Sequence, residues 1–300
     1  MHDEYQFKII GCLQFTKVKT MVLRLPNLPG RQIHISTQSE CRISFRMQEP
    51  KDVNGEPLNL VFLHGFNGNS ASWYYQFTHF LSFRVISIDA PGFGETTVFP
   101  GGMAMFAQEV ATMLSKLNLP SFWLIGHSMG GMLAQVIASQ NSLRCKGLVL
   151  SCTHKGRGRP RNEPLSEDVQ NRIEQRMRLN DFEYGALRVE RMLSTTLSSE
   201  LHEFLTSIAG ENRVEGIRWG GKAMQHLDTT PYLSSIECPT LILSAQDDIV
   251  IKPNALRALI ADLPDAEHIE MTGVGHAPYC EDANGFNDLI EQFILRQLNT

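Results

Sequence analysis

Cysteine is sparse in this chain of 300 residues, and its placement argues against a metal site. The six residues are scattered as Cys12, Cys41, Cys145, Cys152, Cys238 and Cys280. They form no Cys-x-x-Cys pair and no His/Cys cluster at the spacing of zinc ligands, so a zinc site is not expected. The scattered positions predict reduced thiols in a cytoplasmic protein.

Long apolar runs and an excess of charge of one sign are also missing. No stretch approaches the roughly 18 consecutive apolar residues of a membrane span, and the first residues, MHDEYQFKIIG, lack the apolar core of a secretory signal. Lys and Arg number 27 and Asp and Glu number 32, which gives a net charge of −5. This mild acidity predicts no binding to nucleic acid or to an anionic membrane. The expected partner is a small-molecule substrate, and the sequence makes no prediction of the oligomeric state.

What is present is the pattern of an α/β protein. From about residue 57, short apolar runs alternate with longer helical patterns, which predicts a mostly parallel twisted sheet flanked by helices. Most of the apolar runs are continuous, as is typical of strands covered on both faces. The expected strands are Leu58–Leu63, Arg84–Ile88, Phe122–Ile125, Lys146–Leu150, Thr240–Leu243 and His268–Met271. The expected helices are Ala71–Leu81, Met103–Leu117, Gly130–Ser139, Asn254–Ala261 and Asn284–Gln297.

Two regions interrupt this alternation. Residues 1–50 contain strand-like segments at Val18–Leu25 and Arg42–Met47, separated by the turn-forming segment Pro26–Gly30, and are expected to add antiparallel strands at the sheet edge. Residues 154–232 show helical periodicity without a convincing strand, which predicts a helical cap over one end of the sheet. The expected division is a core in two parts, 1–153 and 233–300, with the cap between them.

Within the predicted cap, apolar residues are assigned to its own interior in preference to the substrate. These residues are Met177, Leu187, Met192, Leu197 and Leu201. The basic segment Gly156–Arg161 is expected to be a solvated loop, with contact to an anionic group as the alternative.

The segment most typical of catalysis is Ser121–Gly131, SFWLIGHSMGG. An apolar strand runs directly into Gly126-His127-Ser128-Met129-Gly130 and then into a helix of small residues. A sharp strand-to-helix turn of this kind exposes a serine hydroxyl at the carboxyl end of a sheet, and the flanking glycines avoid clashes there. Ser128 is therefore predicted to be a nucleophile.

A serine hydroxyl needs a base, and the base needs an orienting carboxylate. His276 lies in a glycine-containing loop straight after the last predicted strand, and its side chain can accept and return a proton near neutral pH. Asp247 and Asp248 follow the preceding predicted strand. The predicted triad is Ser128, His276 and one of these two aspartates.

With these motifs in order, the chain resembles the α/β-hydrolase superfamily from about Leu58 to Leu298. The other matching motifs are His64-Gly65-Phe66 after the first core strand and Asp89-Ala90-Pro91-Gly92-Phe93-Gly94 after the next. In such families the acid lies three residues after a glycine that follows the strand, and Ala245 occupies that glycine position here. The resemblance therefore points to Asp248 as the acid, with Asp247 as the alternative.

The resemblance also implies roles for neighbouring residues. The backbone N–H groups of Phe66 and Met129 are the expected oxyanion hole, and Met129 lies at a helix start, where amides are unpaired. His64 is expected to orient its loop and His127 to pack beside the nucleophile. Two acids, Asp89 and Glu95, are expected to be structural. The expected pocket walls without a chemical role are Cys152, Cys280 and Trp73.

The motifs also select among reactions. Haloalkane dehalogenases and soluble epoxide hydrolases carry aspartate at the position of Ser128, and proline iminopeptidases carry HGGPG where residues 64–68 read HGFNG. Hydrolases of meta-cleavage products typically have Asn and Trp where this chain has His127 and Ala277. The chain is most similar to small capped esterases and lactonases, including those resembling 3-oxoadipate enol-lactonase.

The leading hypothesis is a serine hydrolase of a small ester or lactone that uses no metal or cofactor. The alternatives are C–C bond hydrolysis of a meta-cleavage-type diketone, and a non-hydrolytic member of the fold that binds a small molecule as a receptor or carries out cofactor-free oxygen chemistry with the Ser/His pair.

Overall fold

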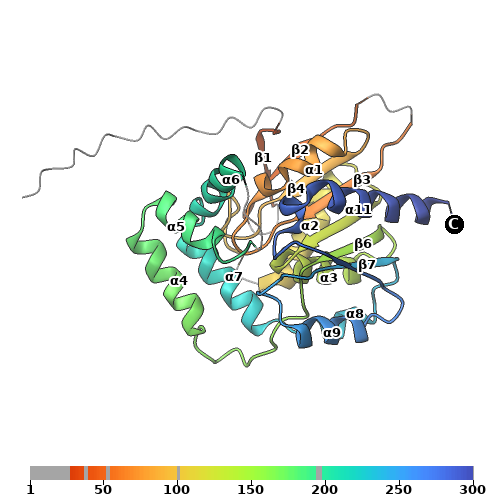
Figure 1. Ribbon diagram of the computed structural model, residues 1–300. Helices are drawn as coiled ribbons and strands as arrows, with labels where there is room; N and C mark the ends of the chain where they lie inside the picture. Colours follow the sequence, from red (N-terminus) through yellow and green to blue (C-terminus); the bar gives the residue numbers. More distant parts are fainter. Residues whose placement is uncertain (1–27, 37–39, 52–54, 100–101, 194–197, 300) are drawn as a thin grey trace, which may run out of the picture.

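One mixed sheet of eight strands organises the protein, whose computed structural model describes residues 28–36, 40–51, 55–99, 102–193 and 198–299 (Figure 1). The strands lie side by side in the order β1-β2-β4-β3-β5-β6-β7-β8. Their bounds are β1 Arg31–Ile35, β2 Arg42–Gln48, β3 Asn59–Leu63, β4 Arg84–Ile88, β5 Phe122–His127, β6 Cys145–Ser151, β7 Thr240–Ala245 and β8 Glu267–Met271.

The strands from β3 to β8 are parallel, and β1 and β2 form an antiparallel edge. This is the expected mostly parallel sheet with antiparallel strands near the N-terminus. The predicted strand Val18–Leu25 lies outside the described residues, as do Cys12, Leu197 and the first residues of the predicted turn Pro26–Gly30.

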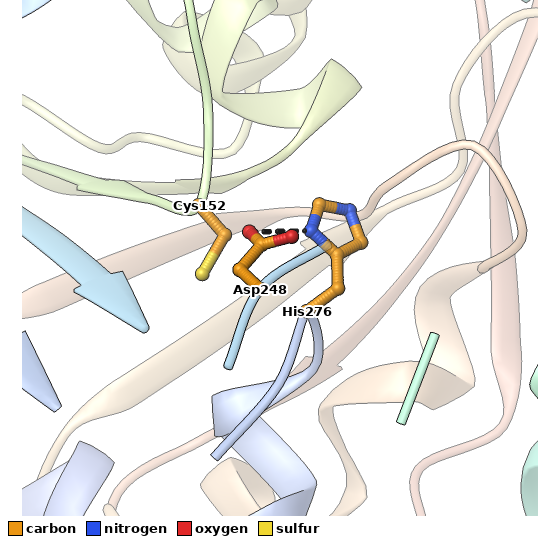
Figure 2. Close-up of side chains that lie close together, drawn as sticks. All are labelled: Cys152, Asp248 and His276. Atoms are coloured by element: carbon orange, nitrogen blue, oxygen red, sulfur yellow. Dashed lines mark hydrogen bonds and ion pairs between the residues drawn. The ribbon is translucent and has the colours of Figure 1, made fainter. Parts of the chain in front are cut away.

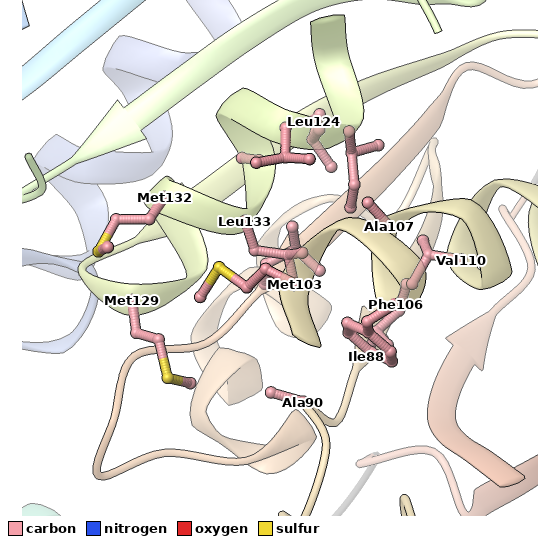
Figure 3. Close-up of a cluster of buried hydrophobic side chains, with 14 of the residues drawn as sticks. Ile88, Ala90, Met103, Phe106, Ala107, Val110, Leu124, Met129, Met132 and Leu133 are labelled. Atoms are coloured by element: carbon pink, nitrogen blue, oxygen red, sulfur yellow. The ribbon is translucent and has the colours of Figure 1, made fainter. Parts of the chain in front are cut away.

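Helices cover both faces of the parallel strands. Alternate strand residues enter different apolar layers, so Val61 of β3 packs with α2 and α3, whereas Leu60 packs with α1 and α11. Figure 3 shows part of the first layer, which includes Phe106 of α2 and Leu133 of α3. The core helices are η1 Ser70–Trp73, α1 Tyr74–His79, α2 Gly102–Lys116, α3 Met129–Gln140, α9 Pro253–Ala261, α10 Pro278–Glu281 and α11 Ala283–Leu298.

The helix predicted at Ala71–Leu81 is shorter and begins differently. Asn69 accepts a hydrogen bond from the N–H of Ala71 (2.8 Å), and the capped turn is a 3-10 helix, η1, that continues as α1 and ends at His79. The capping bond favours a tight first turn because it ties the side chain to an amide only two residues away.

Among the described residues, five helices lie between β6 and β7. Their bounds are α4 Glu167–Arg178, α5 Asp181–Val189, α6 Ser199–Gly210, α7 Val214–His226 and α8 Thr230–Leu233. Helices α4, α5, α6 and α7 gather at one side of the sheet, at the left of Figure 1. Helix α7 approaches the core so closely that a Cβ added to Gly216 would lie 2.4 Å from the carbonyl oxygen of Gly92. The division into core and cap stays a prediction.

Met177 does not belong to the interior of this insertion, and that prediction is wrong. Helix α4 buries Val169 and Ile173, and Met177 continues the same face one turn later but is 72% exposed. The last turn of α4 therefore extends past the apolar surface on which the helix packs. Leu187 is partly buried and Leu201 is buried, as expected.

The topology defines where a ligand can bind. Strand β3 pairs with β4 on one side and with β5 on the other, so the loops after β3 and β5 separate at the carboxyl edge of the sheet. In open α/β sheets such a switch point forms a crevice that binds ligands. No helix among the described residues is long and apolar enough to cross a membrane.

Candidate active site

The turn between β5 and α3 holds Ser128 in a backbone conformation unusual for a residue with a side chain, φ 51° and ψ −117°. Strand β5 ends at His127 and α3 begins at Met129, so this is the expected sharp turn. The N–H of Ser128 donates to the carbonyl oxygen of Ser151 (2.9 Å), and its own carbonyl oxygen accepts from the Thr153 hydroxyl (2.6 Å). These contacts hold the strained conformation in place.

Gly130 brings α3 close to the end of β3. A Cβ at this position would lie 2.1 Å from the carbonyl oxygen of Leu63, which no side chain tolerates. The close approach places the loop after β3 beside the serine: a Cβ on Gly65 would lie 3.2 Å from the Cβ of Ser128.

Ser128, His276 and Asp248 form an unbroken chain of hydrogen bonds. The Ser128 Oγ lies 3.1 Å from His276 Nε2, and His276 Nδ1 lies 2.9 Å from Asp248 Oδ2. Figure 2 shows the imidazole of His276 facing the Asp248 carboxylate. The two side chains are each 6% exposed, which shields this bond from water. The structure thus brings together the three residues selected from widely separated segments.

The turn after β7 distinguishes the two candidate acids. Asp248 Oδ1 accepts the N–H groups of Val250 (2.7 Å) and Ile251 (3.0 Å), which aims Oδ2 at His276. Asp247 is exposed, and its backbone N–H donates to the carbonyl oxygen of Val274. Burial alone would raise the pKa of Asp248, but the hydrogen bond and charge of His276, with the two N–H groups, hold it below its ordinary value. Asp248 is therefore ionised at neutral pH.

The loop that carries His276 is fixed by contacts on both sides. The N–H of His276 donates to the carbonyl oxygen of Met192 (2.9 Å). The carboxylate of Glu281 accepts the N–H groups of Gly275 (3.0 Å) and Ala277 (2.9 Å). Sequence reasoning did not select Glu281, although an acidic residue five positions after the histidine is the signal that could have found it.

His64 orients the peptide that carries the Phe66 N–H. Its Nε2 accepts from the N–H of Ala90 (2.9 Å), which leaves Nδ1 as the donor to the carbonyl oxygen of Gly65 (2.8 Å). Burial lowers the pKa of His64, so this neutral form is favoured. The Gly65 carbonyl and the Phe66 N–H belong to one peptide and point in opposite directions, so this N–H points away from His64. No hydrogen-bond acceptor for it, or for the N–H of Met129, occurs among the described residues.

A cavity of about 160 Å³ opens beside the hydroxyl of Ser128. Its lining comes from the core (Phe66, Asn67, Ser128, His276) and from the insertion (Val169, Arg172, Met192, Gly221, Met224). Met192 thus lines the cavity, although the sequence pattern assigned it to the insertion's own interior in preference to the substrate. The prediction of Trp73, Cys152 and Cys280 as pocket walls is wrong, because these residues belong to a buried apolar cluster and none of them lines the cavity.

A family model described as "alpha/beta hydrolase fold" matches residues 59–283. The chain belongs to the alpha/beta hydrolase family. The resemblance seen in the motifs, and the fold that it implied, are confirmed.

Several known members of this family are similar to the chain. A 2-succinyl-6-hydroxy-2,4-cyclohexadiene-1-carboxylate synthase of Salmonella agona is 26% identical, over 83% of this chain and 99% of that protein. The structure of an enol-lactonase from Burkholderia xenovorans matches with a TM-score of 0.76 at 18% identity, over 88% of this chain and 100% of that chain. A thermophilic esterase from Thermogutta terrifontis, in a malate-bound structure, matches with a TM-score of 0.73 at 25% identity, over 89% of this chain and 99% of that chain.

In this alpha/beta hydrolase, the ring of His127 packs against that of His276. Its ring centroid lies 4.9 Å from that of His276 and 4.9 Å from that of Tyr279. Burial, and next the charge of His276, hold the pKa of His127 well below its ordinary value. His127 is therefore a neutral packing partner, in agreement with its expected position beside the nucleophile.

Asp89 holds together the turn after β4. Its carboxylate accepts the Ser44 hydroxyl (2.6 Å) and the N–H of Ser70 (2.5 Å), and Arg31 lies 3.5 Å away. These bonds agree with the structural role expected of Asp89. Glu95 is exposed.

Cys152, Asp248 and His276 could together face a metal ion, since one ligand atom of each lies within 4.8 Å of the others (Figure 2). Burial, and then the charge of Asp248, hold the pKa of the Cys152 thiol well above its ordinary value. The thiol stays protonated, and metals bind the thiolate. His276 Nδ1 and Asp248 Oδ2 also already satisfy each other. The residues present do not fit a metal centre.

Proposed function

We propose that the protein is a serine hydrolase that cleaves a carboxylic ester or lactone of a small molecule through an acyl-enzyme on Ser128. The observation that carries the proposal is the hydrogen-bond chain from Ser128 through His276 to Asp248, in a chain of the alpha/beta hydrolase family. The enol-lactonase and esterase neighbours support the choice of substrate class.

In the first half of the reaction, Ser128 Oγ forms a bond to the carbonyl carbon of the substrate while His276 Nε2 accepts the hydroxyl proton. The carboxylate of Asp248 stabilises the imidazolium that results. His276 then donates this proton to the leaving oxygen as the carbon–oxygen bond breaks. An ester releases an alcohol, whereas a lactone opens and keeps its hydroxyl on the acyl group.

The N–H groups of Phe66 and Met129 would stabilise the negative oxygen of the tetrahedral intermediate. A backbone donor of this kind contributes about 100- to 1,000-fold in rate. In the second half, His276 removes a proton from water, the hydroxide attacks the acyl carbon, and the proton returns to Ser128 Oγ as the acid leaves. Each proton taken by His276 is returned, so no cofactor is consumed.

The insertion at 154–232 would act as a cap that closes the cavity and sets substrate choice. The support is the contribution of α4 and α7 to the cavity lining. A closed cavity excludes water until the acyl-enzyme has formed and the alcohol has left. We also propose a cytoplasmic location, on the scattered cysteines of the sequence.

Intact mass spectrometry after reaction with a fluorophosphonate tests the proposal. We expect one adduct on the wild-type protein and none on Ser128→Ala, with turnover of a panel of small esters and lactones lost in the same variant. Normal ester turnover by Ser128→Ala would refute the proposal.

Cleavage of a carbon–carbon bond in a diketone is the second candidate. The same three residues would act on a carbon leaving group. A comparison of kcat/KM for esters and for ring-fission diketones separates the two candidates.

A further inference from the structure

Positive charge collects around the cavity beside Ser128. Three arginines line it: Arg157 in the loop after β6, Arg172 on α4 and Arg191 after α5. Asp168 is the one acidic side chain among the described residues of the lining. The whole chain has a net charge of −5, so the lining is opposite in sign to the molecule around it.

Arg172 is the arginine best placed to meet a substrate. Its side chain is partly buried, whereas Arg157 and Arg191 are exposed. The guanidinium carbon lies 5.0 Å from the centre of the Phe66 ring, and Phe66 is the residue whose backbone N–H is assigned to the oxyanion. Arg172 Nη1 donates to Asn67 Oδ1 (2.9 Å), and Asn67 Nδ2 contacts Met192 Sδ (3.0 Å). These contacts hold the guanidinium above the loop that faces Ser128.

Arg172 forms no ion pair among the described residues, and the nearby acid that acts on its charge is Asp168, four residues earlier on the same helix. Arg176 on the same helix pairs with Asp181 (2.7 Å), and Arg213 pairs with Glu215 (3.0 Å), but Arg172 has only the neutral oxygen of Asn67. Burial, and next the positive charge of Arg188, lower the pKa of Arg172 to about 10, so it remains protonated at neutral pH. A partly buried cation that lacks a direct ion pair is costly. Its remaining N–H donors are available to a ligand.

We propose that the substrate carries a carboxylate and that Arg172 binds this carboxylate while the ester carbonyl lies against Ser128. The inference rests on the proposed function and names the substrate class of the same site. A guanidinium fork matches the two oxygens of a carboxylate. Because Arg172 is the one partly buried arginine of the three, the cavity lining holds one positive charge from arginine that is partly removed from water. A singly charged carboxylate therefore suits it better than a doubly charged phosphate.

The size of the cavity limits the acyl group. A volume of about 160 Å³ lies below the roughly 300–1,000 Å³ of pockets for drug-sized ligands. It has room for a short acyl chain between the two functional groups. Half-esters of short dicarboxylic acids are the simplest molecules that join a carboxylate to an ester over such a distance.

The test compares each half-ester with a neutral partner of the same shape. The substrates are the monoethyl esters of malonic, succinic and glutaric acids, each paired with the amide in which the free carboxylate is a carboxamide. Ethanol release gives kcat/KM for the wild-type protein, Arg172→Gln and Arg172→Lys. Arg178→Gln is the matched control, because Arg178 is exposed on the same helix and lies outside the cavity lining.

We expect at least one half-ester to exceed its amide partner in kcat/KM by about tenfold or more in the wild-type protein. Arg172→Gln should lower kcat/KM for that half-ester by about 10- to 100-fold, the usual range for a hydrogen bond to a charged group. The same variant should lower kcat/KM for the amide at least about fivefold less than for the half-ester. Arg172→Lys should lie between wild type and Arg172→Gln, and Arg178→Gln should match wild type.

The inference is overturned if no half-ester exceeds its amide partner, or if Arg172→Gln lowers both equally. Fluorophosphonate labelling separates this failure from failure of the proposed function. Labelled Ser128 with no preference for half-esters leaves the serine hydrolase and removes the carboxylate site.

If neither labelling nor ester cleavage occurs, the proposed function fails, and binding of succinate decides the role of Arg172. A thermal shift by succinate that is lost in Arg172→Gln supports the carboxylate site. No shift by succinate in the wild-type protein, or equal shifts in wild type and variant, would overturn it.

Discussion

Replacing Ser128 with glycine should leave the protein more stable than replacing it with alanine. Both changes remove the hydroxyl and its bond to His276, so their difference isolates the backbone. At φ 51° and ψ −117° a Cβ is unfavourable, and residues held in such regions cost about 1–3 kcal/mol. Glycine removes this cost but makes the unfolded chain more flexible, which takes back about 0.4–1 kcal/mol.

The expected difference is therefore about 1 kcal/mol in the free energy of unfolding, in favour of Ser128→Gly. For a chain of this size it corresponds to about 2 °C in Tm. Equilibrium unfolding in urea, followed by tryptophan fluorescence, measures the difference directly, and fluorophosphonate labelling should be absent in both variants.

Ser207 supplies a control site at which the stability difference between the glycine and alanine variants should be reversed. It is exposed within α6 and has helical geometry, so alanine there should be more stable than glycine by about 1 kcal/mol. If Ser128→Ala proved at least as stable as Ser128→Gly while Ser207 behaved as expected, the turn would not be strained and the reasoning would be refuted.

Three further predictions concern the same site. Asp248→Asn should lower kcat on a cleaved ester by about 10,000-fold with the fold intact, whereas Asp247→Asn should change it by less than about threefold, and steady-state kinetics of both would expose a wrong choice of acid. Folding lowers the pKa of Asp248, so its ionised carboxylate stabilises the protein above the ordinary pKa of 3.8, and this stabilisation is lost as pH falls through the lower folded value. Urea unfolding from pH 7 to 3 should therefore show the difference in free energy of unfolding between wild type and Asp248→Asn decreasing at acid pH. A difference that does not change with pH would contradict this. Gly130→Ala should destabilise the protein by about 2 kcal/mol or more, since its Cβ would lie 2.1 Å from the carbonyl oxygen of Leu63, and a wild-type Tm would show that α3 can shift freely.

The central strands could be predicted because a buried strand appears in the sequence as a continuous apolar run. Strand β4 has the predicted bounds Arg84–Ile88, since a strand covered on both faces must be apolar throughout. Strands β5 and β6 continue to His127 and Ser151, beyond their apolar runs. These two residues pair with each other across the sheet, so backbone hydrogen bonding sets the strand ends where hydrophobicity no longer does.

The serine and the histidine of the candidate site could be predicted because each lies in the turn or loop that follows a strand of the same sheet. The carboxyl ends of parallel strands meet at one edge, so residues in those turns converge whatever their separation along the chain. The residue pattern alone does not distinguish the two candidate acids, because Asp247 and Asp248 are neighbours in one turn. The N–H groups of Val250 and Ile251, which bind Oδ1 of Asp248, decide between them, and backbone amides carry no signal in the sequence.

The position of Arg172 at the cavity could not be predicted from the sequence, because it depends on how the insertion packs on the core. Helix α4 carries Arg172, Arg176 and Arg178, which look alike in the sequence of an amphipathic helix. One faces the cavity, one pairs with an acid of the next helix and one is exposed. What distinguishes Arg172 is its bond to Asn67, 105 residues away, and this contact exists only because the insertion packs on the core. Under the proposed function, the residues that perform the reaction lie in turns and loops that follow strands of the sheet, whereas Arg172, the residue proposed to select the substrate, is held by this packing. A sequence of this family therefore indicates the chemistry before it indicates the substrate.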